Sequence, residues 1–229
     1  IRMDDGELAT ALPIGTLMAC TWNTDLVEKL HTLHGQELVL NNVECMLGPG
    51  INIHRDPLCG RNFEYFSEDP VLTGVMASAA TRGVQKSGAM VTPKHFAANN
   101  QEQNRNNNDS RVSERALREI YLKGFEICVK KAQPLTVMSS YNLLNGLWAS
   151  QNRELLTDIL RGEWGFEGMV TTDWYTHAPQ YTEIAAGNDV KMGCGDPAHT
   201  LKMMREGKLS REDVKISVKR LLEMILKLA

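Results

Sequence analysis

Asp173 is the residue of this sequence whose neighbours most suggest chemistry. It ends a short run of apolar and β-branched residues, GMVTT, and Trp174 and Tyr175 follow at once. A carboxylate walled by aromatic rings can act as a nucleophile or as a general base, because a positioned acid in a dry site can attack or take up a proton. The same residue type also caps helices and closes turns. The stretch alone leaves a helix cap, a surface turn and an active site open.

Charged and polar side chains that could take part in catalysis or binding follow the ends of three other apolar runs. Lys94 and His95 come after GAMVTP. Tyr141 comes after PLTVMSS, and Arg61 lies in the segment after the run that ends near Asn52. In a parallel α/β barrel the carboxyl ends of all strands meet on one face, where catalytic groups collect. An arginine, a lysine, a histidine, a tyrosine and a carboxylate would then share one pocket.

Each of these residues also has a purely structural explanation. Arg61 can pair with Glu64 or Glu68. Tyr141 can pack in the core with its hydroxyl satisfied, and Lys94 with its neighbour can lie in a solvated loop. A lysine directly after a buried strand nevertheless needs a partner. Their occurrence together at four strand ends is what favours a site.

Short apolar runs bounded by Gly, Pro or Asn predict the strands that would carry these residues. The runs span 43–52, 88–96, 134–142, 168–174 and 188–192. Runs without regular alternation of polar residues are typical of parallel strands that are buried on both faces. These runs therefore predict one parallel sheet.

Amphipathic stretches predict helices that alternate with the strands. They span 113–132, which opens with a candidate N-cap at Ser113, and also 152–164 and 210–228. The alternation predicts an α/β fold, and a TIM-type (β/α)8 barrel fits it better than an open sheet. Such a barrel needs eight strands, whereas the sequence offers the runs above and a possible sixth at 10–15. We therefore expect the barrel to be incomplete in this chain.

The composition excludes several classes of function. The 229 residues carry a formal charge of −3 at pH 7, so there is no basic footprint for nucleic acid. No apolar run approaches the roughly 18 residues that cross a membrane. Five scattered cysteines without a CxxC pair predict neither a disulfide framework nor a zinc site, and lean towards a reducing, cytoplasmic compartment. His31 and His34 have helical spacing without a third ligand, so we expect a solvated helix face and no metal.

Several longer stretches are similar to the signatures of one enzyme family. LCGRNFEYFSEDP, KHFAANNQE, RVSERALREIYLKGFE, MSSYN, LLTDILRGEWGFEGMV and TDW resemble the barrel domain of the glycoside hydrolase family 3 β-glucosidases. The likeness runs over almost all of residues 1–229. It implies that this range is one catalytic (β/α)8 barrel domain, apparently without its first strand. It also implies two partners within the parent protein, namely the remaining barrel segment and an α/β sandwich domain.

The resemblance assigns roles to single residues. In this family the aspartate of the [ST]-D-W signature is the nucleophile, which here is Asp173. The residues that would bind or line the sugar are Arg61, Lys94, His95, Met138, Tyr141, Trp174 and Arg2. Arg2 matches the arginine that follows a D-G-P-x-G segment in the family, and that segment does not precede Ile1. The loop KHFAANNQEQ lacks the K-H-F-P-G-H-G pattern of the family's N-acetylglucosaminidases, which disfavours that activity.

The reaction implied by the resemblance is that of a retaining, exo-acting β-glycosidase. A β-glucosidase would release terminal β-D-glucose from β-glucosides or oligosaccharides through a covalent glycosyl-enzyme on Asp173, without a metal or an organic cofactor. A β-xylosidase and a non-catalytic sugar-binding barrel remain as alternatives. Retention needs two carboxyl groups roughly 5–5.5 Å apart, and most members carry the acid/base glutamate in the second domain, so we expect it outside this chain. We also expect Lys94 and Tyr141 to keep the pKa of Asp173 low.

Overall fold

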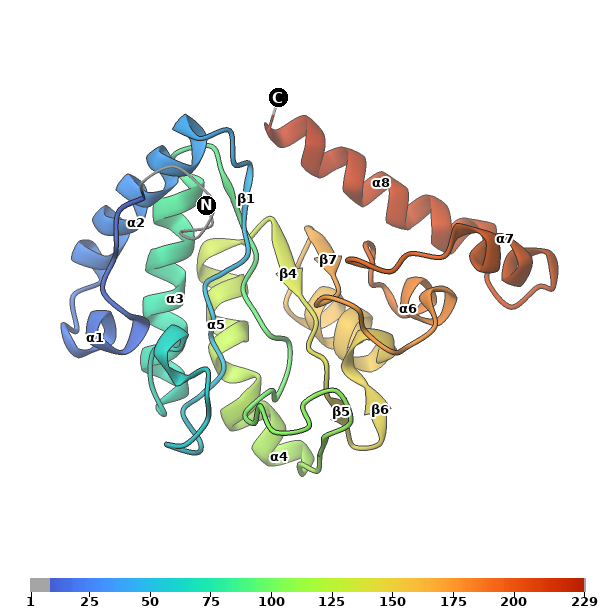
Figure 1. Ribbon diagram of the computed structural model, residues 1–229, viewed down its shortest axis with the longest axis horizontal. Helices are drawn as coiled ribbons and strands as arrows, with labels where there is room; N and C mark the ends of the chain where they lie inside the picture. The colour runs from blue at the N-terminus through green and yellow to red at the C-terminus, as the bar shows by residue number, and fades with distance from the viewer. Residues whose placement is uncertain (1–8, 229) are drawn as a thin grey trace.

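The centre of the molecule is a row of parallel extended segments with helices packed around it (Figure 1). The computed structural model describes residues 9–228. Strand β1 (Cys45–Met46) pairs in parallel with β2 (Met90–Val91), and β4 (Thr136–Met138) pairs in parallel with β7 (Met169–Thr171). Single parallel bridges extend this row, because Phe96 pairs with Ser139, and Thr171 with Val190. The five predicted strand runs therefore lie side by side in chain order, as expected.

The possible sixth strand at 10–15 is wrong. Residues 9–14 have no regular structure, and α1 (Gly15–Cys20) begins where the strand was expected to end. Gly15 allows this helix to approach the loop after β1, since a Cβ atom there would lie 2.7 Å from the backbone oxygen of Tyr65. The α/β class is confirmed, whereas residues 9–228 show no closed eight-stranded barrel.

Three long helices cover one side of the row of strands. They are α2 (Thr24–Leu40), α3 (Pro70–Gln85) and α5 (Lys123–Ala132), and α3 lies between the other two (Figure 1). Gly83 brings α3 against α2, because a Cβ atom there would lie 2.4 Å from the backbone oxygen of Glu28. Close helix packing of this kind needs a small residue at the contact. The result is a dense wall behind the strands.

The three predicted helices are present, with local irregularities. Stretch 113–132 starts as α4 (Glu114–Ala116), passes through the π-helix η2 (Leu117–Tyr121) and continues as α5. Its predicted N-cap is confirmed, since the Ser113 hydroxyl accepts the backbone N–H of Ala116 at 3.3 Å. Stretch 152–164 forms the π-helix η4 (Glu154–Glu163), and stretch 210–228 forms α8 (Arg211–Leu228).

The remaining elements are short and lie at the carboxyl ends of the strands or near the end of the chain. Strands β3 (Asp109–Ser110), β5 (Leu143–Leu144) and β6 (Leu147–Trp148) form a small separate sheet. The 3-10 helices η1 (Asn62–Glu64) and η3 (Ala149–Gln151) and the helices α6 (Gln180–Ala186) and α7 (Pro197–Arg205) complete the structure.

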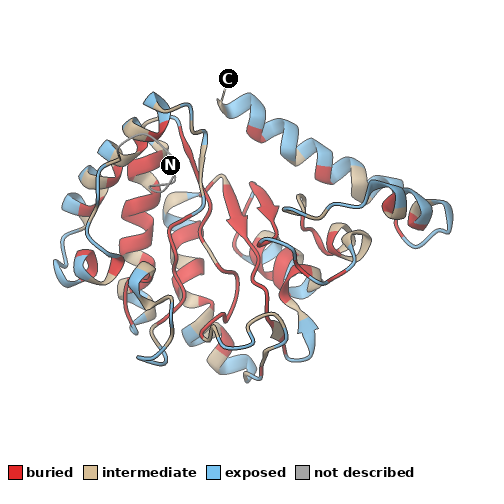
Figure 2. Cartoon of the chain, in the orientation of Figure 1, coloured by how far each residue is buried: buried red, intermediate tan, exposed pale blue. Residues whose placement is uncertain are grey.

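Burial follows the strands and the inner helix faces, while most of α8 is exposed (Figure 2). Among the described residues, no helix combines the length and the apolar character that a membrane span requires. His31 is buried, and its Nδ1 lies 2.9 Å from the backbone oxygen of Val27. The expected solvated helix face is therefore wrong for His31, because this side of α2 packs against α3.

Candidate active site

Asp173 lies directly beyond β7 and is buried at the carboxyl end of the row of strands. Its Oδ1 accepts the backbone N–H of Trp174 at 2.8 Å. Its Oδ2 lies 3.5 Å from Nε2 of His95 and has no hydrogen bond to any described residue. The next helix, α6, begins only at Gln180, so Asp173 is not a helix cap. The carboxylate is thus held by one oxygen and leaves the other available.

Burial dominates the electrostatics of Asp173. Loss of solvent raises the pKa of its carboxyl group above the ordinary value, and the backbone N–H of Trp174 and the charges of Arg61, Lys94 and Arg105 oppose this rise. The expectation of a low pKa is therefore wrong in direction, because desolvation outweighs the nearby cations. A buried carboxyl group whose pKa is tuned by a ring of cations is typical of a functional site.

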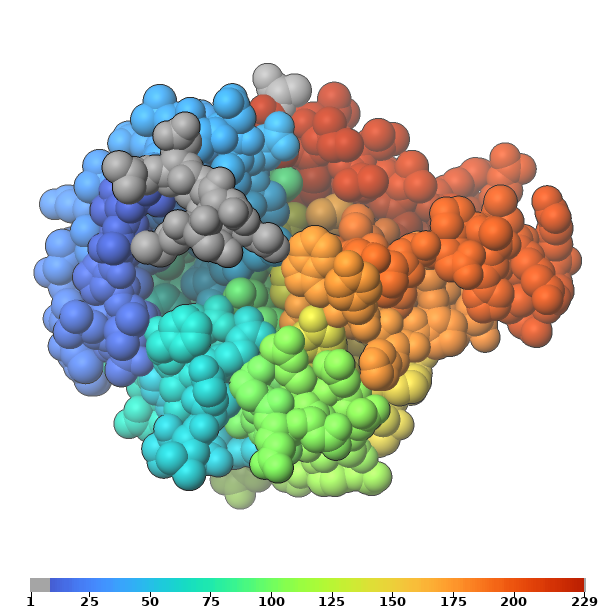
Figure 3. Space-filling view, in the orientation of Figure 1, coloured from blue at the N-terminus to red at the C-terminus, as the bar shows by residue number. Residues whose placement is uncertain are grey.

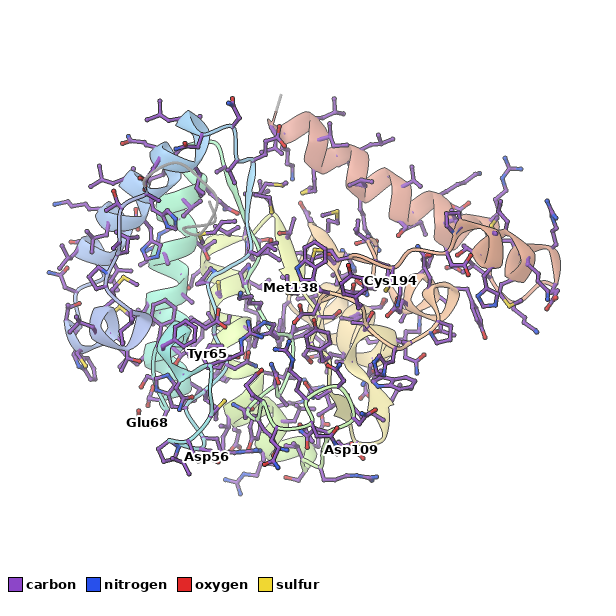
Figure 4. The ribbon with its side chains drawn as sticks, in the orientation of Figure 1. Asp56, Tyr65, Glu68, Asp109, Met138 and Cys194 are labelled. Carbon is purple, nitrogen blue, oxygen red and sulfur yellow. The ribbon has the colours of Figure 1, made fainter. Side chains whose placement is uncertain are left out.

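Glu64 joins the two cations that were expected to bind sugar. One carboxylate oxygen of Glu64 contacts Nε of Arg61, and the other lies 3.1 Å from Nζ of Lys94. The structural pairing of Arg61 with Glu64 is confirmed, whereas Glu68 contacts the hydroxyl of Ser67 instead. In Figure 4 Glu68 lies at the periphery of the molecule, well apart from Met138. Glu64 therefore holds two cations side by side within reach of the charge on Asp173.

His95 is enclosed rather than solvated, with 1% of its surface exposed. Its backbone N–H donates to Oδ1 of Asn52 at 2.7 Å, and its backbone oxygen accepts from Nδ2 of Asn52 at 2.9 Å. Its Nδ1 lies 3.3 Å from the hydroxyl of Tyr65. Burial, aided by the charges of Arg61 and Lys94, lowers the pKa of His95 well below its ordinary value. The ring is therefore neutral and carries one N–H.

Tyr141 brings a hydroxyl and Arg105 a further cation to the same place. Tyr141 follows β4, and burial, followed by the negative charge of Asp173, raises the pKa of Tyr141 to about 12. The guanidinium of Arg105 lies 4.6 Å from the centre of the Tyr141 ring and 2.8 Å from a carboxylate oxygen of Glu102. Sequence reasoning missed Arg105, because a single arginine in the polar tract 99–109 gives no signal of where the loop folds.

Both rings of the aromatic wall are exposed to solvent. Trp174 is 46% exposed, and its ring centre lies 6.1 Å from that of Tyr175. Gly193 lies behind both rings, since a Cβ atom there would come within 2.9 Å of Trp174. Met138 is 2% exposed, deep at the end of β4. Arg2 lies outside the described residues, so its expected role stays a prediction.

The predicted residues come together although they are far apart in the sequence. Arg61 and Lys94 act on the ionisation of both His95 and Asp173, His95 lies 3.5 Å from Asp173, and the charge of Asp173 acts on Tyr141. In Figure 3 cyan, green and orange segments, which lie far apart in the sequence, border a hollow on the face shown. Within residues 9–228, no group of three or more His, Cys, Asp or Glu side chains could hold a metal ion. The arrangement suits a polar, hydroxyl-rich ligand beside a buried carboxylate.

Comparison with known proteins agrees with this arrangement. Residues 2–224 match the glycosyl hydrolase family 3 N-terminal domain. Beta-glucosidase A of Butyrivibrio fibrisolvens is 50% identical over 214 residues, which are 93% of this chain and 26% of that protein. An exo-alpha-(1->6)-L-arabinopyranosidase of Bifidobacterium breve is 45% identical over 91% of this chain and 28% of its own length.

The fold of this chain also matches that of a solved structure. Beta-glucosidase 3B from Thermotoga neapolitana, in complex with glucose, superposes with a TM-score of 0.93 at 47% identity, over 99% of this chain and 33% of that one. The chain thus spans between a quarter and a third of the length of the relatives it matches. The resemblance seen in the sequence is confirmed, and this chain belongs to glycosyl hydrolase family 3, where it matches the N-terminal domain.

Proposed function

We propose that this chain supplies the nucleophile of a retaining, exo-acting β-glucosidase that releases terminal β-D-glucose. The observation that carries the proposal is the environment of Asp173, which is buried at a strand end with Oδ2 free of hydrogen bonds and with three cations nearby. Relatives that are named β-glucosidases support the substrate class.

The proposed first step is attack of Asp173 on the anomeric carbon while the bond to the leaving group breaks. A covalent glycosyl-enzyme forms, and water then releases the sugar with retention of configuration. Arg61 and Lys94 donate to sugar hydroxyls, and Trp174 packs on an apolar face of the ring. His95 lies beside the carboxylate, with Nε2 3.5 Å from Oδ2 of Asp173.

The acid/base residue is proposed to lie elsewhere in a longer polypeptide. Retention requires a second carboxyl group roughly 5–5.5 Å from the nucleophile. The carboxyl groups that surround the site are already in ion pairs, since Glu64 binds Arg61 and Lys94 and Glu102 binds Arg105. Neither is free to give a proton to a leaving group. This fits a chain that spans about a quarter of its relatives.

Covalent trapping tests the proposal. A 2-deoxy-2-fluoro-β-glucoside with a good leaving group should label the full-length protein, and peptide mass mapping should place the sugar on Asp173. Asp173→Asn should take up no label, whereas Asp158→Asn, which alters an exposed carboxylate of η4, should label like the wild type. A protein that binds glucose and takes up no label would be a sugar-binding barrel, which contradicts the proposal.

A pentopyranosidase is the second candidate function. It is favoured by the relative named exo-alpha-(1->6)-L-arabinopyranosidase, and β-xylosidase activity belongs to the same group of five-carbon pyranosides. The corresponding 2-fluoro xyloside and arabinopyranoside should label Asp173 more slowly than the glucoside does. Faster labelling by either one would assign the chain to that substrate instead.

A further inference from the structure

His95 can carry its single ring proton on either nitrogen. The position of this proton decides whether a hydrogen-bond donor or an acceptor faces Asp173. Nε2 lies 3.5 Å from Oδ2 of Asp173. Nδ1 lies 3.3 Å from the hydroxyl of Tyr65 and 3.4 Å from Oδ1 of Asn52. A proton on Nε2 turns a donor toward the carboxylate, whereas a proton on Nδ1 turns a lone pair toward it.

Two acceptors compete for this proton. The amide orientation of Asn52 is fixed, because its Nδ2 donates to the backbone oxygen of His95 while its Oδ1 accepts the backbone N–H of the same residue. Oδ1 of Asn52 can therefore only accept, and it already has a donor. Oδ2 of Asp173 also only accepts when the group is ionised. No described donor meets hydrogen-bond geometry at this oxygen, and the Tyr141 hydroxyl is the other donor close enough to the carboxylate to act on it. Hydrogen bonds to a charged acceptor are stronger than those to a neutral one. A proton that faces Asp173 therefore gains more free energy than one that faces Asn52.

The Tyr65 hydroxyl determines which ring nitrogen of His95 carries the proton. The Tyr65 side chain is fully buried, burial raises the pKa of its hydroxyl far above the ordinary value, and the group therefore keeps its proton. Nδ1 of His95 is the hydrogen-bond partner of this hydroxyl among the described residues. If Nδ1 carried the proton, the Tyr65 O–H would be left buried without an acceptor, which costs free energy.

The Tyr65 ring cannot turn away to avoid this contact. A Cβ atom on Gly50 would lie 2.8 Å from the ring, so the backbone of the first strand run packs directly on it. The rings of Tyr65 and His95 meet edge to face, with centres 6.3 Å apart. Figure 4 shows Tyr65 inside the molecule rather than at its rim. The hydroxyl is therefore held at Nδ1 by packing.

We propose that Tyr65 is a positioning residue whose hydroxyl holds His95 in the tautomer protonated on Nε2, which turns a donor toward the free oxygen of Asp173. The proposal deepens the proposed function and rests on it. A donor that faces a carboxylate favours its ionised form, which is the form that attacks. The other charged or titratable groups that face His95 and Asp173 are Arg61, Lys94, Arg105 and Tyr141. Those that face Tyr65 are Arg61, Glu64, Glu102 and Cys59.

Tyr65→Phe tests the proposal in the full-length protein that contains this chain. The variant removes one oxygen, so the His95 proton moves to Nδ1 and the ring no longer turns an N–H toward Asp173. We expect the acid limb of kcat/KM for an aryl glucoside to move up by about half a pH unit or more, with a several-fold loss at the optimum and an unchanged basic limb. Tyr181→Phe is the matched control, because Tyr181 lies on α6 beside His199. Superimposable profiles for Tyr65→Phe and wild type would overturn the proposal.

Neutron diffraction from deuterium-exchanged crystals of the unmutated protein gives a second test that needs neither a variant nor activity. A deuteron on Nε2 of His95, with the Tyr65 hydroxyl aimed at Nδ1, is the expected result, and a deuteron on Nδ1 would overturn the proposal. Failure of the proposed function is recognised separately, because Asp173→Asn would then keep full turnover whatever the His95 tautomer.

Discussion

At the scale of single residues, the carboxylate of Glu64 balances part of the positive charge around Asp173. Glu64 contacts both Arg61 and Lys94, and both cations act on the carboxyl group of Asp173. Glu64 therefore affects the net charge felt by Asp173 without lying beside it. A residue that was expected to be structural thus has an electrostatic consequence.

We expect Glu64→Gln to move the acid limb of kcat/KM to lower pH. With the charge of Glu64 removed, Arg61 and Lys94 act on Asp173 with less compensation, and a more positive environment lowers the pKa of a carboxyl group. KM should rise because both cations lose the partner that positions them, and the free energy of unfolding should fall by about 1–3 kcal/mol. Activity profiles and urea unfolding measure these effects.

Glu68→Gln is the control for that variant. Glu68 belongs to the same sequence signature but contacts the Ser67 hydroxyl at 3.2 Å rather than a cation. Its profile should match the wild type. A shift of the acid limb to higher pH in Glu64→Gln would show that the two cations do not act on the nucleophile as inferred.

At the scale of elements, a buried ion pair anchors the segment that follows Asp173. Nζ of Lys191 lies 2.9 Å from a carboxylate oxygen of Glu183 and donates to the backbone oxygens of Thr176 and Ala178 at 3.0 and 2.8 Å. The other carboxylate oxygen of Glu183 accepts from the hydroxyls of Thr176 and Ser150. The segment between β7 and α6 is therefore held in place through Thr176 and Ala178.

We expect Lys191→Met to lower the free energy of unfolding by about 3–5 kcal/mol, because Glu183 would stay buried without its cation. Lys202→Met should change it by no more than about 0.5 kcal/mol, since Lys202 is exposed and lies 3.9 Å from Glu206 on the surface. Urea unfolding of both variants measures the difference. Equal stability of the two variants would mean that the buried network does not hold the segment.

At the scale of the whole molecule, α8 is anchored along one side and exposed along the other. Oδ1 of Asp189 accepts from Arg220 and Ser217 at 3.1 Å each, and Met224 packs at the amino ends of the strands. Leu222 and Leu226 point to solvent from the same helix. A hollow of about 670 Å³ lies between α8 and Phe166, which precedes β7, whereas Asp173 follows that strand.

We expect the 229 residues alone to unfold without a sharp transition. The first and last strand runs have free edges within the described part of the chain, and exposed strand edges and apolar side chains favour association over folding. A longer polypeptide that covers α8 should melt cooperatively and bind less of an apolar fluorescent dye. A cooperative melt of the isolated chain without dye binding would contradict this expectation.

The strands and the place of Asp173 at a strand end were predictable from the sequence because both depend on local pattern. Buried parallel strands need apolar runs, and the residues at their carboxyl ends then meet on one face, which is how Lys94, Tyr141 and Asp173 were identified. The failed strand at 10–15 shows the limit of this argument. A short apolar run with a proline and a glycine fits a strand or a helix start equally well, and packing of Gly15 on the loop after β1 decided for the helix.

The α/β class, the strands and the group of residues at their ends follow from the order of the residues alone. Which of these residues are in contact follows from how the chain packs in three dimensions. The bridge from Arg61 through Glu64 to Lys94, the contact of Tyr65 with His95 and the stacking of Arg105 on Tyr141 join residues that are 30 to 36 positions apart, apart from the Arg61–Glu64 pair. Such contacts depend on how loops pack between strands, and the pKa of Asp173 depends on burial, so neither leaves a pattern in the local sequence.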